Sequence, residues 1–393
     1  MKQNQNIKDN SIYYEFGKDI FGPFLFGFAS WMNEQITQSA VDKVLFLARD
    51  GYMMQKAYEI ITSEKDRKPH AYFYCSRKSL RNALLWHFDE YEESIKYINV
   101  LKQISVGYML EYYGFPEEEW GKILADEKID ADFSVAYDHV ATCAVYKRIY
   151  DDYKGIIIAR SKEQDSILLE YIKHIGLEKR IAIVDIGWHG SMQFYLEEFF
   201  SYHNIEIAVV GLYVGIYSFC DIQGEKYGYL FNSGEDDYRK KVMCSHGILE
   251  KLFQSLEGST SGYKLKEGKV VPVNLEYEYK DDKKVKECIS CWQAGALETI
   301  GDLSQHETSA DLKKYAERLI DFGMKPTLND IRVFSFMYNF DGEKYYYTAQ
   351  RNLLGYGIGK LKKDLLKSPW KTGFMKSVLK IPFPYYLIYK WVS

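Results

Sequence analysis

Short apolar segments alternate with segments of helical periodicity between residues 43 and 217, and this alternation constrains the fold more than any other feature of the sequence. The apolar runs lie at 43–48, 70–76, 181–185 and 205–217. After each of the first three runs, apolar residues recur at the three- and four-residue spacing of a helix. Buried strands joined by helices indicate a parallel sheet that is covered on both faces. We therefore expect an α/β fold with an open, mainly parallel sheet.

The remaining segments suggest additions to this sheet. An apolar helix is expected over residues 11–40, with a break near Gly22-Pro23, and an amphipathic helix over 161–177. Residues 88–150 have a polar, helical pattern without an obvious strand and are interpreted as an inserted helical layer. We expect an α/β core over residues 1–263 that includes this layer, a mixed α+β extension over 264–345, and a basic, aromatic tail over 346–393.

Composition narrows the class of protein. The 393 residues are 47% hydrophobic and 27% charged, as in an ordinary globular protein, and a net charge of −4 argues against a generally basic nucleic-acid-binding protein. The six cysteines include one CxxC pair, Cys288 and Cys291, so neither a disulfide framework nor a zinc site is expected. The first ten residues lack the apolar region of a signal peptide, and no run of 18 apolar residues occurs. We expect a cytoplasmic protein without a membrane-spanning helix.

Polar residues follow three of the predicted strands. They are Arg49-Asp50-Gly51, Ser76-Arg77-Lys78, and the segment from Asp185 to Ser191. Ligands of open parallel sheets bind beyond the carboxyl ends of the strands, near the beginnings of helices. These three strand ends are therefore expected to converge on one pocket that binds an anionic ligand.

The segment from Asp185 to Ser191 has the features of a phosphate-binding turn. Gly187 and Gly190 permit positive φ angles and a close approach of the backbone to a ligand. A helix that begins at Ser191 offers free N–H groups, a favourable dipole and a hydroxyl to a phosphate, and His189 adds a group that can carry a proton. Asp185 can hold a ribose hydroxyl or Mg²⁺. The alternative is an ordinary strand-to-helix turn with Ser191 as the N-cap.

The end of the first strand carries two charged residues. Arg49 and the backbone of Gly51 are expected to contact an anionic group, and Asp50 to bind metal or to act as a base. The alternative is that Arg49 and Asp50 pair with each other or cap the following helix.

Basic residues also follow the second strand. Ser76 ends it, and Arg77 and Lys78 begin a predicted helix that also contains Arg81, four residues after Arg77. Alone, this pattern is typical of a solvated basic face. Beside the other two strand ends, it favours a pocket for several negative charges, such as a pyrophosphate.

Two later segments complete the candidate features. A helix within 246–263 is expected to place Glu250 and Glu257 on one face, with Glu250 at the border of the pocket. Residues 360–393 contain eight Lys and one Asp among Trp, Phe, Tyr and Leu. This composition suits contact with an anionic membrane surface at its cytoplasmic face, and the alternative is a tail that packs on its own domain.

Four segments of the chain resemble the C-terminal region of large bacterial proteins labelled as predicted hydrolases of the haloacid dehalogenase (HAD) superfamily. They are FGPFLFGF with the following Trp, VLFLARDGYMMQKAY, YCSRKSLRNA and VDIGWHGSMQ, and the resemblance covers about residues 11–263. Such proteins occur with glycosyltransferases of capsule and lipopolysaccharide synthesis. Their phosphatase signature, a strand that ends in DxDxT, belongs to an N-terminal half outside this sequence. If LFLARDGY is aligned with that signature, Ala48 replaces the nucleophilic Asp, and no aspartyl-phosphate can form.

The same region is similar in plan to phosphoribosyltransferases, including glycosyltransferases of the ribofuranosyl type that are often paired with a HAD phosphatase. The resemblance implies transfer of a ribose phosphate unit from phosphoribosyl pyrophosphate to a glycan or a lipid-linked saccharide, with Mg²⁺ as cofactor. It implies that Asp185, Gly187, Gly190 and Ser191 hold the 5-phosphate and ribose of the donor, and that Arg49, Asp50 and Gly51 form the pyrophosphate loop. Asp50 and Asp185 would be the catalytic residues and the metal ligands. The sequence departs from that family at Ile186, where its members have a second acid, and in a shorter turn.

Two other functions remain open at the level of sequence. One is a HAD-type phosphatase that acts on sugar phosphates in capsule or lipopolysaccharide synthesis. The other is a non-catalytic partner of the same machinery.

Overall fold

A five-stranded parallel sheet forms the centre of the computed structural model, which describes residues 11–217, 221–306, 311–341 and 343–392. The strand order is β2-β1-β5-β6-β7, and each pair of neighbours is parallel. The expectation of an open parallel sheet is therefore confirmed. The strands are β1 (Lys43–Leu47), β2 (His70–Phe73), β5 (Arg180–Trp188), β6 (Ala208–Ile216) and β7 (Glu225–Gly228).

The order of the strands contains one reversal. From β1 the chain goes to β2 on one side, and it later returns to β5 on the other side of β1. In open α/β sheets, the crevice beyond the carboxyl ends of two such strands is the usual ligand site. The topology therefore singles out the space beyond β1 and β5.

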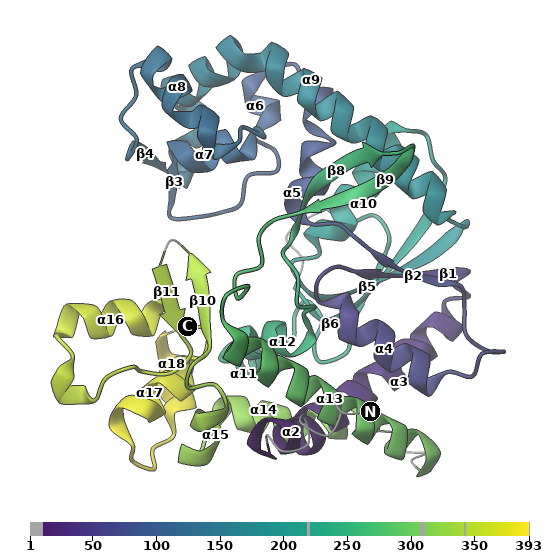
Figure 1. The fold of residues 1–393 in the computed structure, drawn as a ribbon, viewed down its shortest axis with the longest axis vertical. Helices are drawn as coiled ribbons and strands as arrows, with labels where there is room; N and C mark the ends of the chain where they lie inside the picture. The colour runs from purple at the N-terminus through teal and green to yellow at the C-terminus, as the bar shows by residue number, and fades with distance from the viewer. Residues whose placement is uncertain (1–10, 218–220, 307–310, 342, 393) are drawn as a thin grey trace.

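Helices cover both faces of the sheet, as predicted (Figure 1). Alternate residues of β1 belong to different cores: Val44 and Phe46 pack with α3 (Gly22–Gln38) and α4 (Gly51–Ile61). Leu45 and Leu47 pack with α9 (Ala144–Ile175) and α10 (Ser191–Tyr202). This division follows from the two-residue period of a strand whose faces are both apolar.

The N-terminal helix is broken where the sequence predicts it. A short helix α2 (Ser11–Phe16) continues through one π-helical turn, η1 (Gly17–Phe21), into α3, which begins at Gly22-Pro23. Helix α13 (Lys283–His306) packs against α2, η1, α3 and α4. A Cβ atom on Gly17 would lie 2.0 Å from the carbonyl oxygen of Trp292, so glycine permits this close approach.

The helical layer is larger and less uniform than predicted. It contains a two-stranded antiparallel ladder, β3 (Gln103–Ser105) with β4 (Ser134–Ala136), where no strand was expected. Its last helix, α9, runs for 32 residues, so it begins in the layer and ends on the sheet, and the expected boundary at 150 falls inside it. The other elements are α5 (Arg77–Asn82), η2 (Leu85–His87), α6 (Tyr91–Ser94), α7 (Val106–Tyr112), α8 (Glu117–Glu127) and η3 (Tyr137–Thr142).

The segment after the sheet returns to the core. Helix α11 (Asp236–Met243) and helix α12 (His246–Phe253) precede an antiparallel hairpin of β8 (Thr260–Lys266) and β9 (Lys269–Asn274). The prediction that Glu250 and Glu257 share a helix is wrong, because α12 ends at Phe253.

The C-terminal part shares a hydrophobic core with the N-terminal helices and one face of the sheet. Trp370 is completely buried in it, and the Trp370 ring stacks on Phe322 with centroids 5.2 Å apart. Among the described residues, no helix is both long enough and apolar enough to cross a membrane. The elements here are η4 (Leu312–Ala316), α14 (Glu317–Met324), α15 (Leu328–Val333), β10 (Tyr338–Asp341), β11 (Glu343–Tyr346), η5 (Leu353–Gly355), α16 (Ile358–Lys367), α17 (Lys371–Leu379) and α18 (Tyr385–Val392).

Candidate functional site

A cavity of about 860 Å³ lies beyond the carboxyl ends of β1 and β5, and we call it the strand-end cavity. The helical layer and β10 also contribute to its wall. In Figure 1 this layer and the β10–β11 hairpin lie one above the other on the left of the sheet. The cavity therefore occupies the topological switch point, with additional walls from two segments that are distant in the sequence.

Ten of the twelve residues that the sequence predicts for the site line this one cavity. They are Arg49, Asp50, Ser76, Arg77, Lys78, Asp185, Gly187, His189, Ser191 and Glu250. Gly51 and Gly190 are buried and are not among the lining residues. A Cβ atom on Gly51 would lie 2.6 Å from the carbonyl carbon of Phe46, so this glycine permits α4 to begin close against β1.

Asp50 is a half-buried carboxylate without a partner. It takes the N-cap position of α4 but makes no capping hydrogen bond, and within the described ranges it forms no ion pair. Asp50 therefore does not cap the helix and forms no ion pair with Arg49, although the nearby charge of Arg49 lowers the pKa of Asp50. Burial raises the pKa of Asp50 well above its usual range, and the nearby carboxylates of Asp185 and Glu250 raise it further.

Asp185 lies inside β5 rather than at its end, because the strand continues to Trp188. Burial raises the pKa of Asp185 to about 6. The backbone N–H of Gly187 donates to the Asp185 carboxylate over 3.4 Å, and backbone hydrogen bonds and Arg77 oppose the rise in pKa. Asp50 and Asp185 thus form an acidic pair at the switch point, in which burial favours the protonated form of both carboxyls.

The turn after Asp185 is built from left-handed backbone conformations. Gly187 has φ 99° and Gly190 has φ 71°, and Trp188 between them has φ 66°. A positive φ is uncommon for a large side chain. Here it accompanies a hydrogen bond of 3.2 Å from the indole N–H of Trp188 to Glu250, which fixes the side of the cavity that α12 forms.

Ser191 is the first residue of α10, and Gly190 is its N-cap. The alternative prediction that Ser191 caps this helix is wrong, and no side chain makes a capping hydrogen bond there. The hydroxyl of Ser191 and the first N–H groups of α10 therefore lie at the cavity wall, where an anion is favoured. Burial lowers the pKa of His189, and Arg77 lowers it further.

Several of the predicted cations are already paired. Arg49 donates to Glu278 over 2.6 Å and to the backbone carbonyl of Glu257 over 3.1 Å. Lys78 pairs with Glu111 of α7 over 3.0 Å. Both side chains line the cavity, but their charges are partly neutralised by the protein itself.

The two arginines of α5 have fewer interaction partners within the protein. Arg77 is exposed and forms no hydrogen bond or ion pair with any described residue, although it lowers the pKa of Asp185. Arg81 is buried, and its guanidinium lies 4.4 Å from the ring centroid of Tyr112, while its Nε atom has no hydrogen-bond partner. Ser76 differs, because its hydroxyl caps α5 by accepting from the backbone N–H of Ser79 and donates to the carbonyl of Thr260.

Helix α12 and the loops that follow it contribute residues to the cavity wall that the sequence does not predict. Lys251 is almost completely buried and lies 3.0 Å from Glu278, which it shares with Arg49. Burial alone would raise the pKa of Glu278, but Lys251 and Arg49 lower it to about 2. Gln254 is also buried in the wall, and its side-chain Nε2 atom lacks a partner. No spacing in the sequence indicates these contacts, because they join segments that meet only in the folded chain.

The donor set suits Mg²⁺ better than a closed metal site. No cluster of three or more His, Cys, Asp or Glu side chains in the described part of the chain could hold a metal ion. Mg²⁺, however, is commonly held by one or two carboxylates together with phosphate oxygens of a substrate. Burial raises the pKa values of Asp50 and Asp185, and a bound divalent cation would favour the ionised form of both carboxylates.

Comparison with known protein families found no family that matches the chain, and comparison with curated proteins found no match.

Proposed function

We propose that the protein is a transferase that moves a ribose phosphate unit from phosphoribosyl pyrophosphate to a saccharide acceptor, as the resemblance in its sequence implies. The observation that carries the proposal is that Asp50 and Asp185 lie in one cavity at the switch point of a parallel sheet, and that neither forms an ion pair with a cation of the described residues. Unpaired arginines and the beginning of a helix lie in the same wall. Such a cavity suits a ligand with several phosphates and a sugar ring between them.

In this proposal, three parts of the cavity wall bind three parts of the donor. The beginning of α10, with Ser191, receives the 5-phosphate through backbone N–H groups and a hydroxyl. Arg77 and Arg81 receive the pyrophosphate, which gives the unpartnered Nε atom of Arg81 an acceptor. Asp185 accepts hydrogen bonds from ribose hydroxyls.

The transfer itself requires positioning and one proton acceptor. The bond between C1 of the ribose and the pyrophosphate oxygen breaks, and the pyrophosphate leaves with the bonding electrons. A hydroxyl oxygen of the acceptor forms the new bond to C1, and its proton passes to a carboxylate, for which Asp50 is the candidate. The arginines stabilise the charge that develops on the leaving group.

Asp50 and Asp185 are also the residues that would hold Mg²⁺, which when bound would offset the charge of the pyrophosphate. Two roles are thus open to Asp50, metal ligand and base. Excess Mg²⁺ should partly restore an Asp50→Asn variant in the first case and not in the second.

The test is binding and turnover with defined donors. Isothermal titration with phosphoribosyl pyrophosphate and Mg²⁺ should give binding that Arg81→Ala weakens about tenfold or more. Ribose 5-phosphate and nucleotide sugars serve as comparison ligands, and pyrophosphate release in the presence of saccharides reports turnover.

Other outcomes would favour the other functions. Release of inorganic phosphate from sugar phosphates, abolished by Asp50→Asn, would overturn the proposal in favour of a phosphatase. Tight donor binding without turnover for any saccharide would favour a non-catalytic partner. The phosphatase has less support, because Ala48, which cannot act as a nucleophile, lines the cavity where the resemblance would require an Asp.

A further inference from the structure

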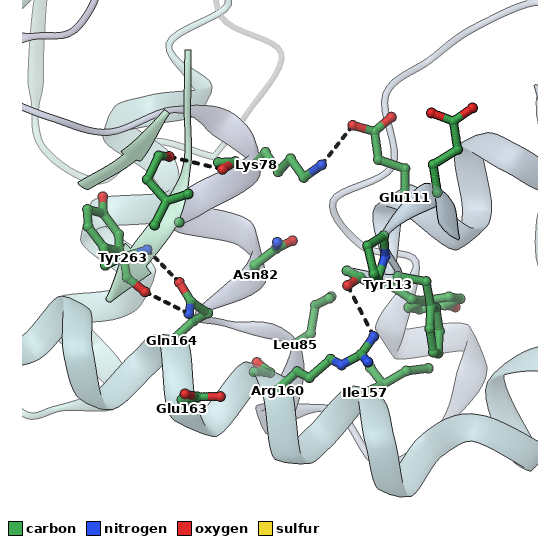
Figure 2. Close-up of a pocket in the computed structure, with 18 of the residues that line it drawn as sticks. Lys78, Asn82, Leu85, Glu111, Tyr113, Ile157, Arg160, Glu163, Gln164 and Tyr263 are labelled. Carbon is green, nitrogen blue, oxygen red and sulfur yellow. Dashed lines mark hydrogen bonds and ion pairs between the residues drawn. The ribbon is translucent and has the colours of Figure 1, made fainter. Parts of the chain in front are cut away.

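A second cavity, of about 610 Å³, adjoins the strand-end cavity, and we call it the side cavity. The two share Lys78, Glu111 and Leu275. The ion pair between Lys78 and Glu111 therefore stands at their boundary, and Figure 2 shows it reaching from α5 to the helical layer. A ligand long enough to pass this pair would occupy both cavities.

The charges of the side cavity do not suit an anion. Its two cations are Lys78 and Arg160, and each already has a carboxylate partner. Arg160 donates to both oxygens of Glu119, over 2.7 and 3.0 Å. Two further lining carboxylates, Glu117 and Glu163, are exposed and form no ion pair with any residue in the described ranges. A phosphate would meet uncompensated negative charge, whereas a neutral ligand rich in hydroxyls would meet acceptors.

The centre of the side cavity contains an amide that the protein leaves unused. Asn82 points into the space between α9 and the helical layer (Figure 2), and neither of its amide atoms has a hydrogen-bond partner in the described structure. Gln164 offers a contrast, because both of its amide atoms are bound to the backbone of Tyr263, over 3.1 and 2.8 Å. Gln164 therefore holds the wall together, and Asn82 is available to a ligand.

Aromatic and aliphatic side chains supply the apolar part of the wall. Trp120 is half-buried, and its indole N–H donates to the carbonyl of Phe115 over 2.9 Å, which fixes the ring in place. Leu85 and Ile157 complete an apolar surface beside the amide and the carboxylates. A sugar ring presents C–H groups on its faces and hydroxyls at its edge. The fixed ring of Trp120 matches the C–H groups, and the amide of Asn82 and the lining carboxylates match the hydroxyls.

We propose that the side cavity binds a neutral saccharide, with hydrogen bonds from its hydroxyls to Asn82 and Glu163 and contact of its ring with Trp120. This inference rests on the proposed function in one respect, since it makes the bound saccharide the acceptor. The end of that saccharide reaches past Lys78 and Glu111 toward Asp50. Binding of the saccharide itself depends only on the side cavity.

Saturation-transfer NMR tests this proposal with the methyl glycosides of glucose, galactose, mannose and N-acetylglucosamine at millimolar concentration. At least one glycoside should bind, and Asn82→Ala and Glu163→Gln should each weaken it about tenfold. Methyl glucuronide, which carries a negative charge, should bind more weakly than methyl glucoside. Glu170→Gln is the matched control, because Glu170 is an exposed glutamate of the same helix α9 outside both cavities.

The outcomes separate this inference from the proposed function. Glycoside binding that persists unchanged in both variants, or the absence of any glycoside binding, would overturn the inference, even if phosphoribosyl pyrophosphate binds. Glycoside binding that depends on Asn82 and Glu163 without any binding of the donor would support the side cavity and overturn the transferase. Glu163→Gln changes an exposed side chain, so its result does not depend on the stability of Asn82→Ala.

Discussion

Asp50 and Asp185 are half-buried carboxylates, and no cation of the described residues forms an ion pair with either of them. Each would ordinarily titrate near pH 4, and each is held where burial and a neighbouring carboxylate favour the protonated form. A structural carboxylate is normally paired or hydrogen-bonded, as Glu278 is. Asp50 forms no ion pair with any described residue and makes no capping hydrogen bond, and we therefore propose for Asp50 a role in binding or chemistry.

Replacement of Asp50 by Asn should separate stability from activity. Turnover of the donor should fall by about 100-fold or more, because in the proposed transferase Asp50 is either the proton acceptor or a metal ligand. The free energy of unfolding should rise by about 1 kcal/mol at pH 7, because a buried charge without a partner is removed. Urea denaturation and a pyrophosphate-release assay measure the two effects. A less stable variant with full activity would contradict the role proposed for Asp50.

The raised pKa of Asp185 predicts a pH dependence of stability. Its pKa is about 6 in the folded protein, above the value of about 3.9 in an unfolded chain. The folded state therefore binds this proton more tightly, and stability is lost as the pH rises from about 4 through 6. Asp185→Asn should gain about 2 kcal/mol more in free energy of unfolding at pH 7 than at pH 4. Urea denaturation at both pH values checks this, and an equal gain at the two would contradict it.

At the scale of elements, Glu278 joins three segments that meet beside the cavity. It lies in the loop after β9, and its carboxylate binds Arg49 of the β1–α4 turn and Lys251 of α12. Lys251 is only 5% exposed, so the loss of its partner would leave a buried charge.

Glu278→Gln should therefore lower the free energy of unfolding by about 3 kcal/mol. Glu276→Gln is the matched control, because Glu276 lies two residues away and, within the described ranges, forms an ion pair only with the exposed Lys280; it should change stability by less than about 0.5 kcal/mol. Thermal and urea denaturation of both variants measure the difference. Equal effects would show that the cluster around Glu278 does not stabilise the fold.

The elements that the sequence predicted correctly share a strong local pattern. The core of β1 and most of β6 are buried on both faces and read directly as apolar runs, and the beginning of α10 follows from two glycines and a serine. The strands β3 and β4 have three residues each, too few for a two-residue period to be visible. The sequence places only residues 144–150 of α9 in the layer and predicts a separate helix over 161–177, because the exposed face of α9 carries charges of both signs and no cap marks its beginning.

The candidate site likewise contains residues that a local sequence pattern predicts and residues whose position depends on the folded chain. Asp50 and Asp185 could be proposed from sequence because the carboxyl ends of parallel strands meet at one edge. Lys251, Gln254 and Glu278 could not, because their positions depend on how α12 and the β8–β9 hairpin pack against the sheet. The roles that the sequence assigns to the predicted residues remain proposals, although the structure brings ten of them to one cavity.

At the scale of the whole molecule, the C-terminal segment is partly core and partly exposed apolar surface. Trp370 and Phe374 are buried, whereas Leu354, Ile358 and Trp391 are 97, 90 and 92% exposed. Four lysines of α16 are exposed as well: Lys360, Lys362, Lys363 and Lys367. Contact of this segment with an anionic membrane surface remains a proposal, and deletion of residues 360–393 is not a suitable test, because it would remove Trp370 from the core.

Exposed substitutions test the membrane contact without disturbing the core. The double variant Leu354→Ser and Ile358→Ser should bind phosphatidylglycerol vesicles about tenfold more weakly than the parent protein, since two apolar side chains no longer enter the interface. Vesicle sedimentation measures this, phosphatidylcholine vesicles test the contribution of charge, and Leu265→Ser, an exposed residue of β8, is the control. Failure of the parent protein to bind phosphatidylglycerol vesicles would contradict the proposal.

The helix α9 has a mechanical consequence for both cavities. Its 32 residues form a continuous rod of about 48 Å, of which Tyr146 and Tyr150 pack in the helical layer and Leu168 and Tyr171 pack toward the sheet. The distance between the helical layer and the sheet is therefore set by one continuous helix. Ligands of different size must be accommodated by side chains and loops along this strut, because the strut itself can neither stretch nor shorten.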